Sequence, residues 1–213
     1  MATEIEIKLK APDRETLDAA LSSAELTPFL RDQFETTHMR STYYDTPNGE
    51  LRTRRWTLRL REEGSRRIAA MKTVSEKTPD GMFTRGEWQC ACDSIAEAIG
   101  QLVEQGAPPE LGGLARDGLI ETCVAEFDRR SAYLYLPDGV VVEMAGDTGT
   151  LEAGGRREPI LELEMELLFG SASVLVPLAE QLTEEYPLVP ETRSKYERAL
   201  ALLDEAHAPE TTP

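Results

Sequence analysis

Hydrophobic and polar residues alternate along several short segments of the chain. In residues 3–10, Ile5, Ile7 and Leu9 alternate with charged residues. Because successive side chains of a β-strand point to opposite faces, this period of two predicts a strand. Similar alternation between turn-forming residues predicts seven more strands, at 39–45, 55–63, 66–74, 83–89, 122–136, 139–146 and 159–168.

Other segments carry apolar residues at helical spacing. We expect helices at 13–24, from 93 or 94 to about 105, at 171–185 and at 194–206. Pro177 lies inside the third of these, so that helix should be kinked or start late. The Gly- and Pro-rich stretch 106–118 predicts a long loop.

The predicted strands follow one another in mostly hairpin order. About eight strands and four helices therefore indicate an α+β fold with an antiparallel sheet. A length of 213 residues suits one domain, which we place at residues 1–206. The polar tail 207–213 is expected to be disordered.

Composition excludes several classes of protein. The chain has no run of 18 apolar residues, and residues 1–10 resemble no signal peptide, so we expect a cytoplasmic protein without a membrane span. A net charge of −16 argues against nucleic acid as a partner. Cys90, Cys92 and Cys123 lack the further ligands of a zinc site, and we interpret them as small buried side chains.

Basic residues concentrate in one part of this acidic chain. Ten of them, against five acids, lie between Arg40 and Lys77. This asymmetry is compatible with a local anion site, and equally with solvated basic strands.

Like charges are sorted onto separate strand faces. Glu4 and Glu6 share one face, as do Glu162, Glu164 and Glu166, whereas Arg59 and Arg61 share another. One face of an antiparallel sheet is commonly solvated, which explains any single strand. Three in-phase glutamates nevertheless repel one another, and hard cations such as Mg²⁺ or Mn²⁺ need such carboxylates. If the sheet closed into a barrel, its lumen would combine acidic residues for metal with basic residues for a polyanion such as triphosphate.

The chain also resembles a known family. The order of its motifs is similar to that of the CYTH superfamily, also called the triphosphate tunnel metalloenzymes. These motifs are Glu4-Ile5-Glu6-Ile7-Lys8, Tyr43-Tyr44-Asp45-Thr46-Pro47, Leu58-Arg59-Leu60-Arg61, Met71-Lys72-Thr73, Arg85-Gly86-Glu87, Phe127-Asp128-Arg129, Val142-Glu143 with Asp147, Glu162-Leu163-Glu164-Met165-Glu166 and Ser194-Lys195-Tyr196. The resemblance covers about residues 3–203 and implies an eight-stranded antiparallel β-barrel, or tunnel, with a polar lumen and flanking amphipathic helices.

The resemblance also implies a role for particular residues. Metal ligands would be Glu4, Glu6, Glu162 and Glu164, although the spacing leaves open which pair among Glu162, Glu164 and Glu166 contacts the metal. The triphosphate would be held by Lys8, Arg59, Arg61, Lys72, Arg129 and Lys195. Glu4, Glu6, Lys8, Lys72 and Lys195 would form the catalytic set, with Glu87 and Asp147 in support. Arg129 and Arg130 are adjacent, so only one of them can face the lumen, and the spacing from Phe127 favours Arg129.

The activity implied is Mg²⁺- or Mn²⁺-dependent hydrolysis of a triphosphate, by in-line attack of water on the terminal phosphorus. Only 6% of the residues are aromatic, which favours inorganic triphosphate over a substrate with an organic group. Thiamine triphosphate or another organic triphosphate, the cyclisation of ATP by a class IV adenylyl cyclase, and non-catalytic polyphosphate binding remain alternatives, as does an ordinary interaction protein with a solvated sheet. We expect a monomer or a homodimer.

Overall fold

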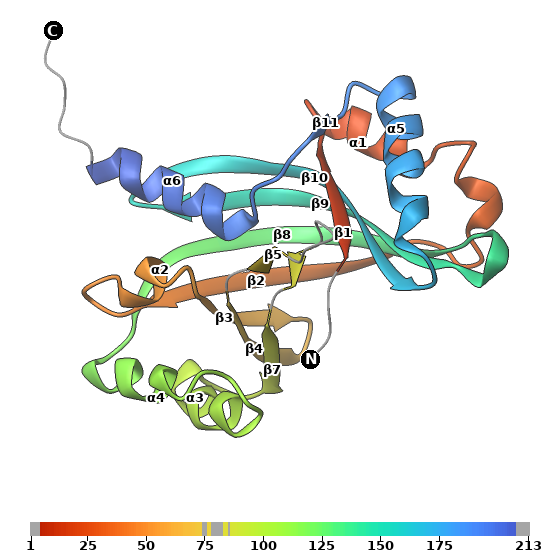
Figure 1. Ribbon diagram of the computed structural model, residues 1–213. Coiled ribbons are helices and arrows are strands. Elements are labelled where there is room, and N and C mark those ends of the chain that lie inside the picture. The colour runs from red at the N-terminus through yellow and green to blue at the C-terminus, as the bar shows by residue number, and fades with distance from the viewer. Residues whose placement is uncertain (1–4, 74–75, 78–82, 85, 208–213) are drawn as a thin grey trace, which may run out of the picture.

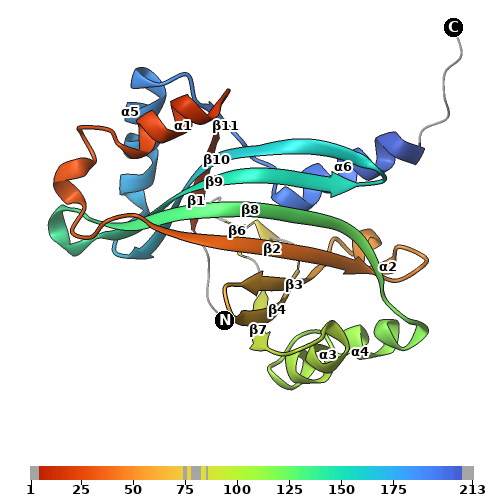
Figure 2. The same ribbon diagram turned by 180° about the vertical axis from the view of Figure 1, so that it is seen from behind.

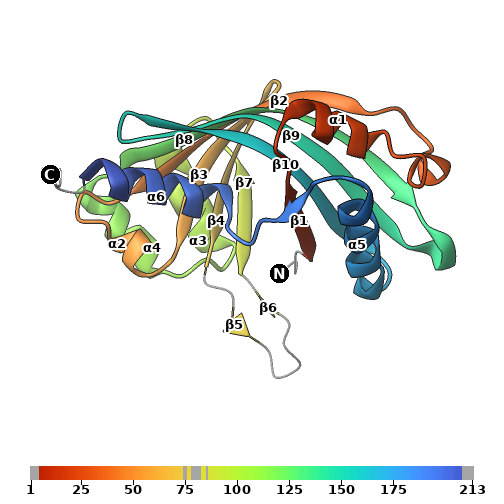
Figure 3. The ribbon, with the colours of Figure 1, turned by 90° about the horizontal axis from the view of Figure 1, so that it is seen from above.

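A computed structural model describes residues 5–73, 76–77, 83–84 and 86–207. Within them, nine strands form one antiparallel sheet of order β11-β1-β10-β9-β8-β2-β3-β4-β7, and β5 pairs with β6 separately. The sheet is strongly curved, so that its two ends face each other across a hollow (Figures 1 and 3). The strands are β1 (Glu6–Lys10), β2 (Glu35–Asp45), β3 (Thr57–Glu63), β4 (Arg66–Lys72), β5 (Glu76–Lys77), β6 (Phe83–Thr84), β7 (Glu87–Ala91), β8 (Ile120–Tyr135), β9 (Val141–Ala153), β10 (Arg156–Phe169) and β11 (Val189–Pro190).

The helices of the described residues lie on both faces of this sheet. They are α1 (Arg14–Leu21), α2 (Glu50–Thr53), α3 (Ile95–Glu104), α4 (Glu110–Leu114), α5 (Leu175–Glu185) and α6 (Lys195–His207), with 3₁₀ turns η1 (Thr27–Phe29), η2 (Ala115–Asp117), η3 (Pro137–Gly139) and η4 (Ala172–Val174). No helix among the described residues is long and apolar enough to span a membrane.

Two helical layers cover the convex face. Helices α1 and α5 lie against the part of the sheet formed by β1, β9 and β10 (Figure 2). They pack on the outward side chains of these strands, which include Leu9, Met144 and Leu163. Helix α3 and the short α4 cover β3, β4 and β7 around Leu58 and Met71. Burial of these apolar side chains provides most of the stabilisation of each layer.

Helix α6 lies on the concave face instead. Its residues Tyr196, Ala199 and Leu202 pack against inward side chains of β2, β8, β9 and β10, among them Tyr43 and Phe127. The ring of Tyr196 stacks on that of Tyr43 with centroids 5.0 Å apart. This apolar cluster fills one end of the hollow, and the rest of the concave face is polar.

The sequence predicted the fold class and most elements correctly, but the strand count and the loop at 106–118 were wrong, and closure into a barrel is not detected among the described strands. The main sheet has nine strands rather than eight, because β11 pairs with the edge of β1. The described strands do not close into a barrel: β11 occupies part of that edge, and β7 ends the sheet on the other side. The loop expected at 106–118 contains α4 and η2, because Leu111 is buried among the side chains of the α3 layer.

Other boundaries shifted without changing the architecture. The third predicted helix starts late, with η4 before α5, as Pro177 in its first turn requires. Strand β9 runs to Ala153, well beyond the predicted end at 146, because it pairs with β8 and β10 along its length. Of the tail predicted to be disordered, His207 ends α6 and the remainder lies outside the described residues.

Candidate functional site

A polar cavity of about 600 Å³ occupies the concave face beside α6. Seven acidic and seven basic residues line it, so its wall carries almost no net charge. They are Glu6, Glu35, Glu63, Glu87, Glu143, Glu164 and Glu166, with Lys8, Arg59, Arg61, Arg66, Lys72, Arg129 and Lys195.

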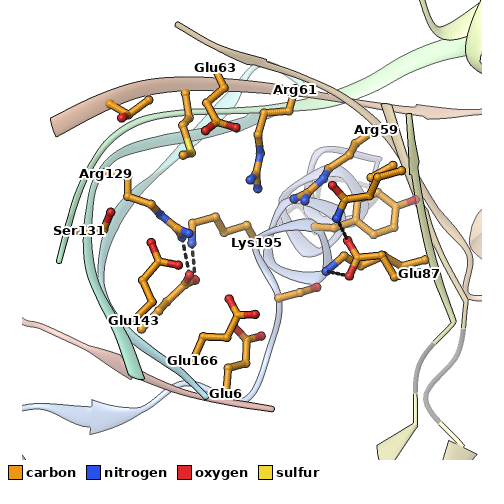
Figure 4. Close-up of a pocket in the computed structure, with 18 of the residues that line it drawn as sticks. Glu6, Arg59, Arg61, Glu63, Glu87, Arg129, Ser131, Glu143, Glu166 and Lys195 are labelled. Carbon is orange, nitrogen blue, oxygen red and sulfur yellow. Dashed lines mark hydrogen bonds and ion pairs between the residues drawn. The ribbon is translucent and has the colours of Figure 1, made fainter. Parts of the chain in front are cut away.

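Strand alternation explains why these side chains share one space. Glu6 and Lys8 are two residues apart on β1, and cross-strand pairing sets them beside Glu166 and Glu164 of β10. On the far side of the cavity, Arg59 and Arg61 are likewise two residues apart on β3, so both point away from the face that carries the buried Leu58. Figure 4 shows the two arginines pointing inward opposite Glu6, Glu143 and Glu166, with Lys195 between.

Arg59 and Arg61 have no carboxylate partner among the described residues. The Nε of Arg59 is buried without a hydrogen bond, and Arg61 donates from its Nε to the Ser41 hydroxyl at 3.3 Å. Burial, together with the nearby charges of Arg59 and Arg129, lowers the pKa of Arg61 to about 10. Two adjacent, poorly solvated guanidinium groups therefore form a site that favours an anion.

Lys195, unlike Arg59 and Arg61, is surrounded by carboxylates. Its ammonium lies 2.7 Å from Asp147, 2.6 Å from Glu162 and 2.8 Å from Glu164. Burial disfavours its charge, but the three carboxylates outweigh burial and raise the pKa of Lys195. The amine is thus a fixed cation at the base of the cavity, at the first residue of α6.

Arg129 joins the same cluster from β8. Its Nε and one Nη bond both oxygens of Asp147, at 2.7 and 2.6 Å, and that Nη also contacts Glu164. Burial opposes ionisation of Glu164, yet Lys195 and Arg129 hold the pKa of that carboxyl well below its usual range. Both bases of this cluster are therefore paired with carboxylates, three acids facing two bases.

Two further ion pairs lie in the cavity wall. Lys72 of β4 contacts Glu87 of β7 at 3.0 Å, and Gln89 donates to the same carboxylate at 2.6 Å. Lys8 contacts Glu6 at 2.8 Å. Burial lowers the pKa of Lys8, but Glu6 and Glu164 outweigh that effect, so the net shift is upward.

A hard divalent cation has suitable donors in this site. One carboxylate oxygen each of Asp147, Glu162 and Glu164 lies within 4.8 Å of the others, an arrangement consistent with metal binding. A second row of acids crosses three neighbouring strands, since Glu166 pairs with Glu6 on one side and with Glu143 on the other. In the structure the first group is also the one that surrounds Lys195.

Most of the site residues expected from sequence come together, but not all. Those that line the cavity are Glu6, Lys8, Arg59, Arg61, Lys72, Glu87, Arg129, Glu164 and Lys195. Asp147 and Glu162 are fully buried behind its surface, and Glu4 lies outside the described residues. Arg130 points to the convex side, where it contacts Asp18 of α1 at 2.6 Å.

The sequence analysis assigned no role to several residues of this region, among them Glu143, which it named only within a motif, and the buried Arg198; the others are Glu35, Glu63 and Arg66 of the cavity wall. Glu143 is in phase with Asp147 on β9, four residues away, so period-two alternation assigns it to the same face. Arg198 is fully buried and contacts Glu158 and Glu162 of β10. The sequence feature that could have identified Arg198 is its position three residues after Lys195, since residues at that spacing are neighbours on a helix.

Comparison with known proteins agrees with this architecture. The sequence pattern of the CYTH domain matches residues 2–200 of the chain. An inorganic triphosphatase of Haemophilus influenzae is 25% identical over 209 residues, or 95% of this chain and 55% of that protein. The chain thus spans about half the length of this relative.

Solved structures show the same fold at lower identity. A candidate adenylyl cyclase from Hippeastrum, described as having a dominant triphosphatase activity, superimposes with a TM-score of 0.58 at 20% identity. The match covers 93% of this chain and 95% of the other. A candidate adenylate cyclase from Bacillus halodurans gives a TM-score of 0.52 at 16% identity, over 93% of this chain and 98% of that one.

Proposed function

The chain belongs to the CYTH domain family, and from that membership and the cavity we propose that it hydrolyses inorganic triphosphate to pyrophosphate and phosphate with the help of a divalent metal. The observation that carries the proposal is the pair Arg59 and Arg61. Both are aimed into a cavity and, within the described part of the chain, have no carboxylate to neutralise them. Burying cations in this way is unfavourable unless an anion joins them.

The balance of charge in the cavity supports a metal-bound polyanion. Equal numbers of acidic and basic residues line the wall. A triphosphate brings about four or five negative charges, more than the two unpaired arginines neutralise. Additional cations must therefore enter with the substrate, and the carboxylates of the site are the donors that Mg²⁺ or Mn²⁺ prefers.

We assign roles to the residues on this basis. Arg59 and Arg61 would bind the phosphate oxygens from one wall, with Lys8, Lys72, Arg129 and Lys195 completing the clamp. Glu4, Glu6, Glu162 and Glu164 would hold metal, and Asp147 and Glu87 would orient Arg129 and Lys72. When bound, the metal would polarise the attacking water and neutralise phosphate charge. Cationic side chains placed in advance would stabilise the charge that develops on the leaving pyrophosphate.

The identity of the substrate has specific alternatives. Thiamine triphosphate or another organic triphosphate would use the same clamp, and a class IV adenylyl cyclase would act on ATP in it. A non-catalytic polyphosphate-binding module would keep the basic residues without needing the acids. The presence of Glu6, Glu162 and Glu164 favours an enzyme. We propose further that residues 1–206 form one domain, acting in the cytoplasm as a monomer or homodimer.

The test measures phosphate release from tripolyphosphate, ATP and thiamine triphosphate with Mg²⁺, Mn²⁺ or Ca²⁺, together with cyclic AMP formation from ATP. We expect turnover to be fastest with tripolyphosphate, to require metal, and to be mostly lost in Glu6→Gln. Glu180→Gln, a change at an exposed residue of α5, is the matched control. Stabilisation by tripolyphosphate without any metal-dependent phosphate release would instead identify a binding module.

A further inference from the structure

Arg198 is a fully buried base that does not reach the cavity. Its relative exposure is 0%, and it is absent from the residues that line the cavity. Among the described residues, its side-chain hydrogen bonds all go to β10: Nε and Nη2 donate to Glu158 at 2.9 and 2.5 Å, Nη2 donates to the Pro159 carbonyl at 2.8 Å, and Nη1 donates to Glu162. A guanidinium buried without substrate contact needs an explanation other than binding.

Glu162 links this arginine to the site. One of its oxygens accepts from Arg198, and the other accepts from Lys195 at 2.6 Å. Glu162 is itself fully buried, so it has no water to replace either partner. Two cations one turn apart on α6 therefore share a single carboxylate.

The apolar contacts of α6 do not by themselves set the position of Lys195. Tyr196, Ala199 and Leu202 form an apolar stripe that holds the helix against the sheet. Apolar packing is non-directional, whereas the planar fork of an arginine fixes both distance and orientation relative to its acceptors. The bonds from Arg198 to three groups of β10 thus set the register of the first turn of α6 along that strand.

We propose that Arg198 is a positioning residue, which holds Glu162 and the start of α6 so that the ammonium of Lys195 is presented to the cavity. Without Arg198, Glu162 would keep Lys195 as its one cationic partner among the contacts described, and would draw that amine away from Glu164. This inference rests on the proposed function for its kinetic effect. The placement of Lys195 itself can be measured without turnover.

The kinetic test compares Arg198→Met, Arg198→Lys, Lys195→Met and the double variant Arg198→Met/Lys195→Met with Mg²⁺ and tripolyphosphate. We expect Arg198→Met to lower kcat about tenfold to a hundredfold, with KM changed less than about threefold, as for a misplaced catalytic group. Arg198→Lys keeps the charge and should recover part of kcat. In the Lys195→Met background, removal of Arg198 should have little further effect on kcat, because residues that act through one another are not additive.

Arg52→Met is the matched control. Arg52 forms an exposed pair with Asp204 of α6 at 2.8 Å, so this change also removes an arginine contact of the helix but leaves Glu162 untouched. It should leave kcat unchanged. A purely structural Arg198 would lower the melting temperature while the folded fraction of Arg198→Met kept the wild-type kcat, and that result would overturn the proposal. A loss of kcat on removal of Arg198 that was as large in the Lys195→Met background would overturn it as well.

A second measurement follows Lys195 directly. Reductive methylation followed by peptide mass spectrometry should find Lys195 less reactive in Arg198→Met than in the wild-type protein, because its amine is then held at the buried Glu162 instead of facing the cavity. Arg198→Lys, which retains a cation on Glu162, should show a smaller change and replaces Arg198→Met if that variant does not fold. Inactivity of the wild-type protein on tripolyphosphate would contradict the proposed function, but this readout would still apply. Unchanged protection of Lys195 in the Arg198 variants would overturn the positioning role by itself.

Discussion

The cavity holds its basic side chains in two different ways. On β3, Arg59 and Arg61 lie next to each other without a carboxylate partner in the described residues, and the pKa of Arg61 is lowered to about 10. Opposite them, Lys195 and Arg129 are surrounded by Asp147, Glu162 and Glu164. We call the first group the arginine pair, defined by Arg59 and Arg61, and the second the acid–base cluster, defined by the five residues just named.

The difference separates bases that already have carboxylate partners within the described residues from bases that have none. Every charged group of the acid–base cluster has an oppositely charged partner within the protein, so removing one partner leaves another buried and less well paired. The arginine pair opposes itself, so removing one member relieves repulsion. Substitutions in the acid–base cluster should therefore lower the free energy of unfolding. Substitutions in the arginine pair should lower activity without lowering stability.

The largest effect on stability is expected from Glu162→Gln in the acid–base cluster. This change leaves Lys195 and the buried Arg198 without a shared carboxylate. Breaking a buried pair in this way destabilises a protein by about 3–5 kcal/mol. Urea unfolding followed by circular dichroism measures the change in the free energy of unfolding.

Glu152→Gln serves as the control for that prediction. Glu152 also pairs with an arginine, Arg157, at 2.7 Å, but both side chains are largely exposed. An exposed pair contributes at most about 1 kcal/mol. Equal destabilisation by the two changes would show that burial of the cluster does not matter.

Arg61→Gln should separate activity from stability. We expect turnover of tripolyphosphate to fall by about a hundredfold, since a buried charged contact to phosphate contributes roughly 3 kcal/mol. The melting temperature should stay the same or rise, because Arg61 is half-buried beside the like charges of Arg59 and Arg129. Steady-state kinetics and thermal unfolding of one preparation give both values.

Arg40→Gln is the matched control, since Arg40 is exposed and contacts Glu126 rather than the cavity. It should leave turnover unchanged. A loss of stability in Arg61→Gln comparable to that of Glu162→Gln would remove the distinction between the two regions.

Lys72 represents an intermediate case, because it lies in the cavity wall but is paired with Glu87 at 3.0 Å. Glu87→Gln should raise the KM for tripolyphosphate severalfold and reduce stability by about 1 kcal/mol, less than in the acid–base cluster. Kinetics and urea unfolding check both parts. No change in KM would mean that Glu87 does not orient Lys72 toward the substrate.

The smallest effect is expected at His38, an ion pair outside the cavity. The hydrogen bond that His38 donates from Nδ1 to the Asp128 carboxylate, 2.8 Å away, raises the pKa of His38 above 6.5. Because the folded-state pKa is the higher one, this stabilisation is fully present below about pH 6.5 and is lost as pH rises through the folded-state pKa. His38→Gln should therefore lower the free energy of unfolding more at pH 5.5 than at pH 8.5, by less than about 1 kcal/mol for so exposed a group. A difference independent of pH would contradict the assignment.

Alternation in the sequence was enough to assign residues to faces. Glu6, Lys8, Arg59 and Arg61 were expected to point into one space, and the structure places all four in the cavity wall. Arg129 rather than Arg130 faces inward, as the spacing from Phe127 favoured. These expectations succeeded because a period of two is a local property of any strand, whatever its neighbours.

The sequence did not predict which residues each of these side chains contacts. Glu162 and Glu164 are equivalent in the pattern of their strand, yet only Glu164 lines the cavity, while Glu162 is buried between Lys195 and Arg198. The difference arises because α6 crosses the concave face at the level of Glu162. The position of a helix against distant strands depends on apolar packing across the whole sheet.

The sequence by itself determined the antiparallel sheet and the sorting of acidic and basic residues onto separate strand faces, because strand periodicity and side-chain chemistry are local. Only the tertiary structure decided that β11 occupies part of the edge of β1, that the described sheet stays open, and that the bases of the acid–base cluster are paired with carboxylates while the arginine pair is not. Those features depend on the register between strands far apart in the chain, and a shift of register changes every cross-strand neighbour.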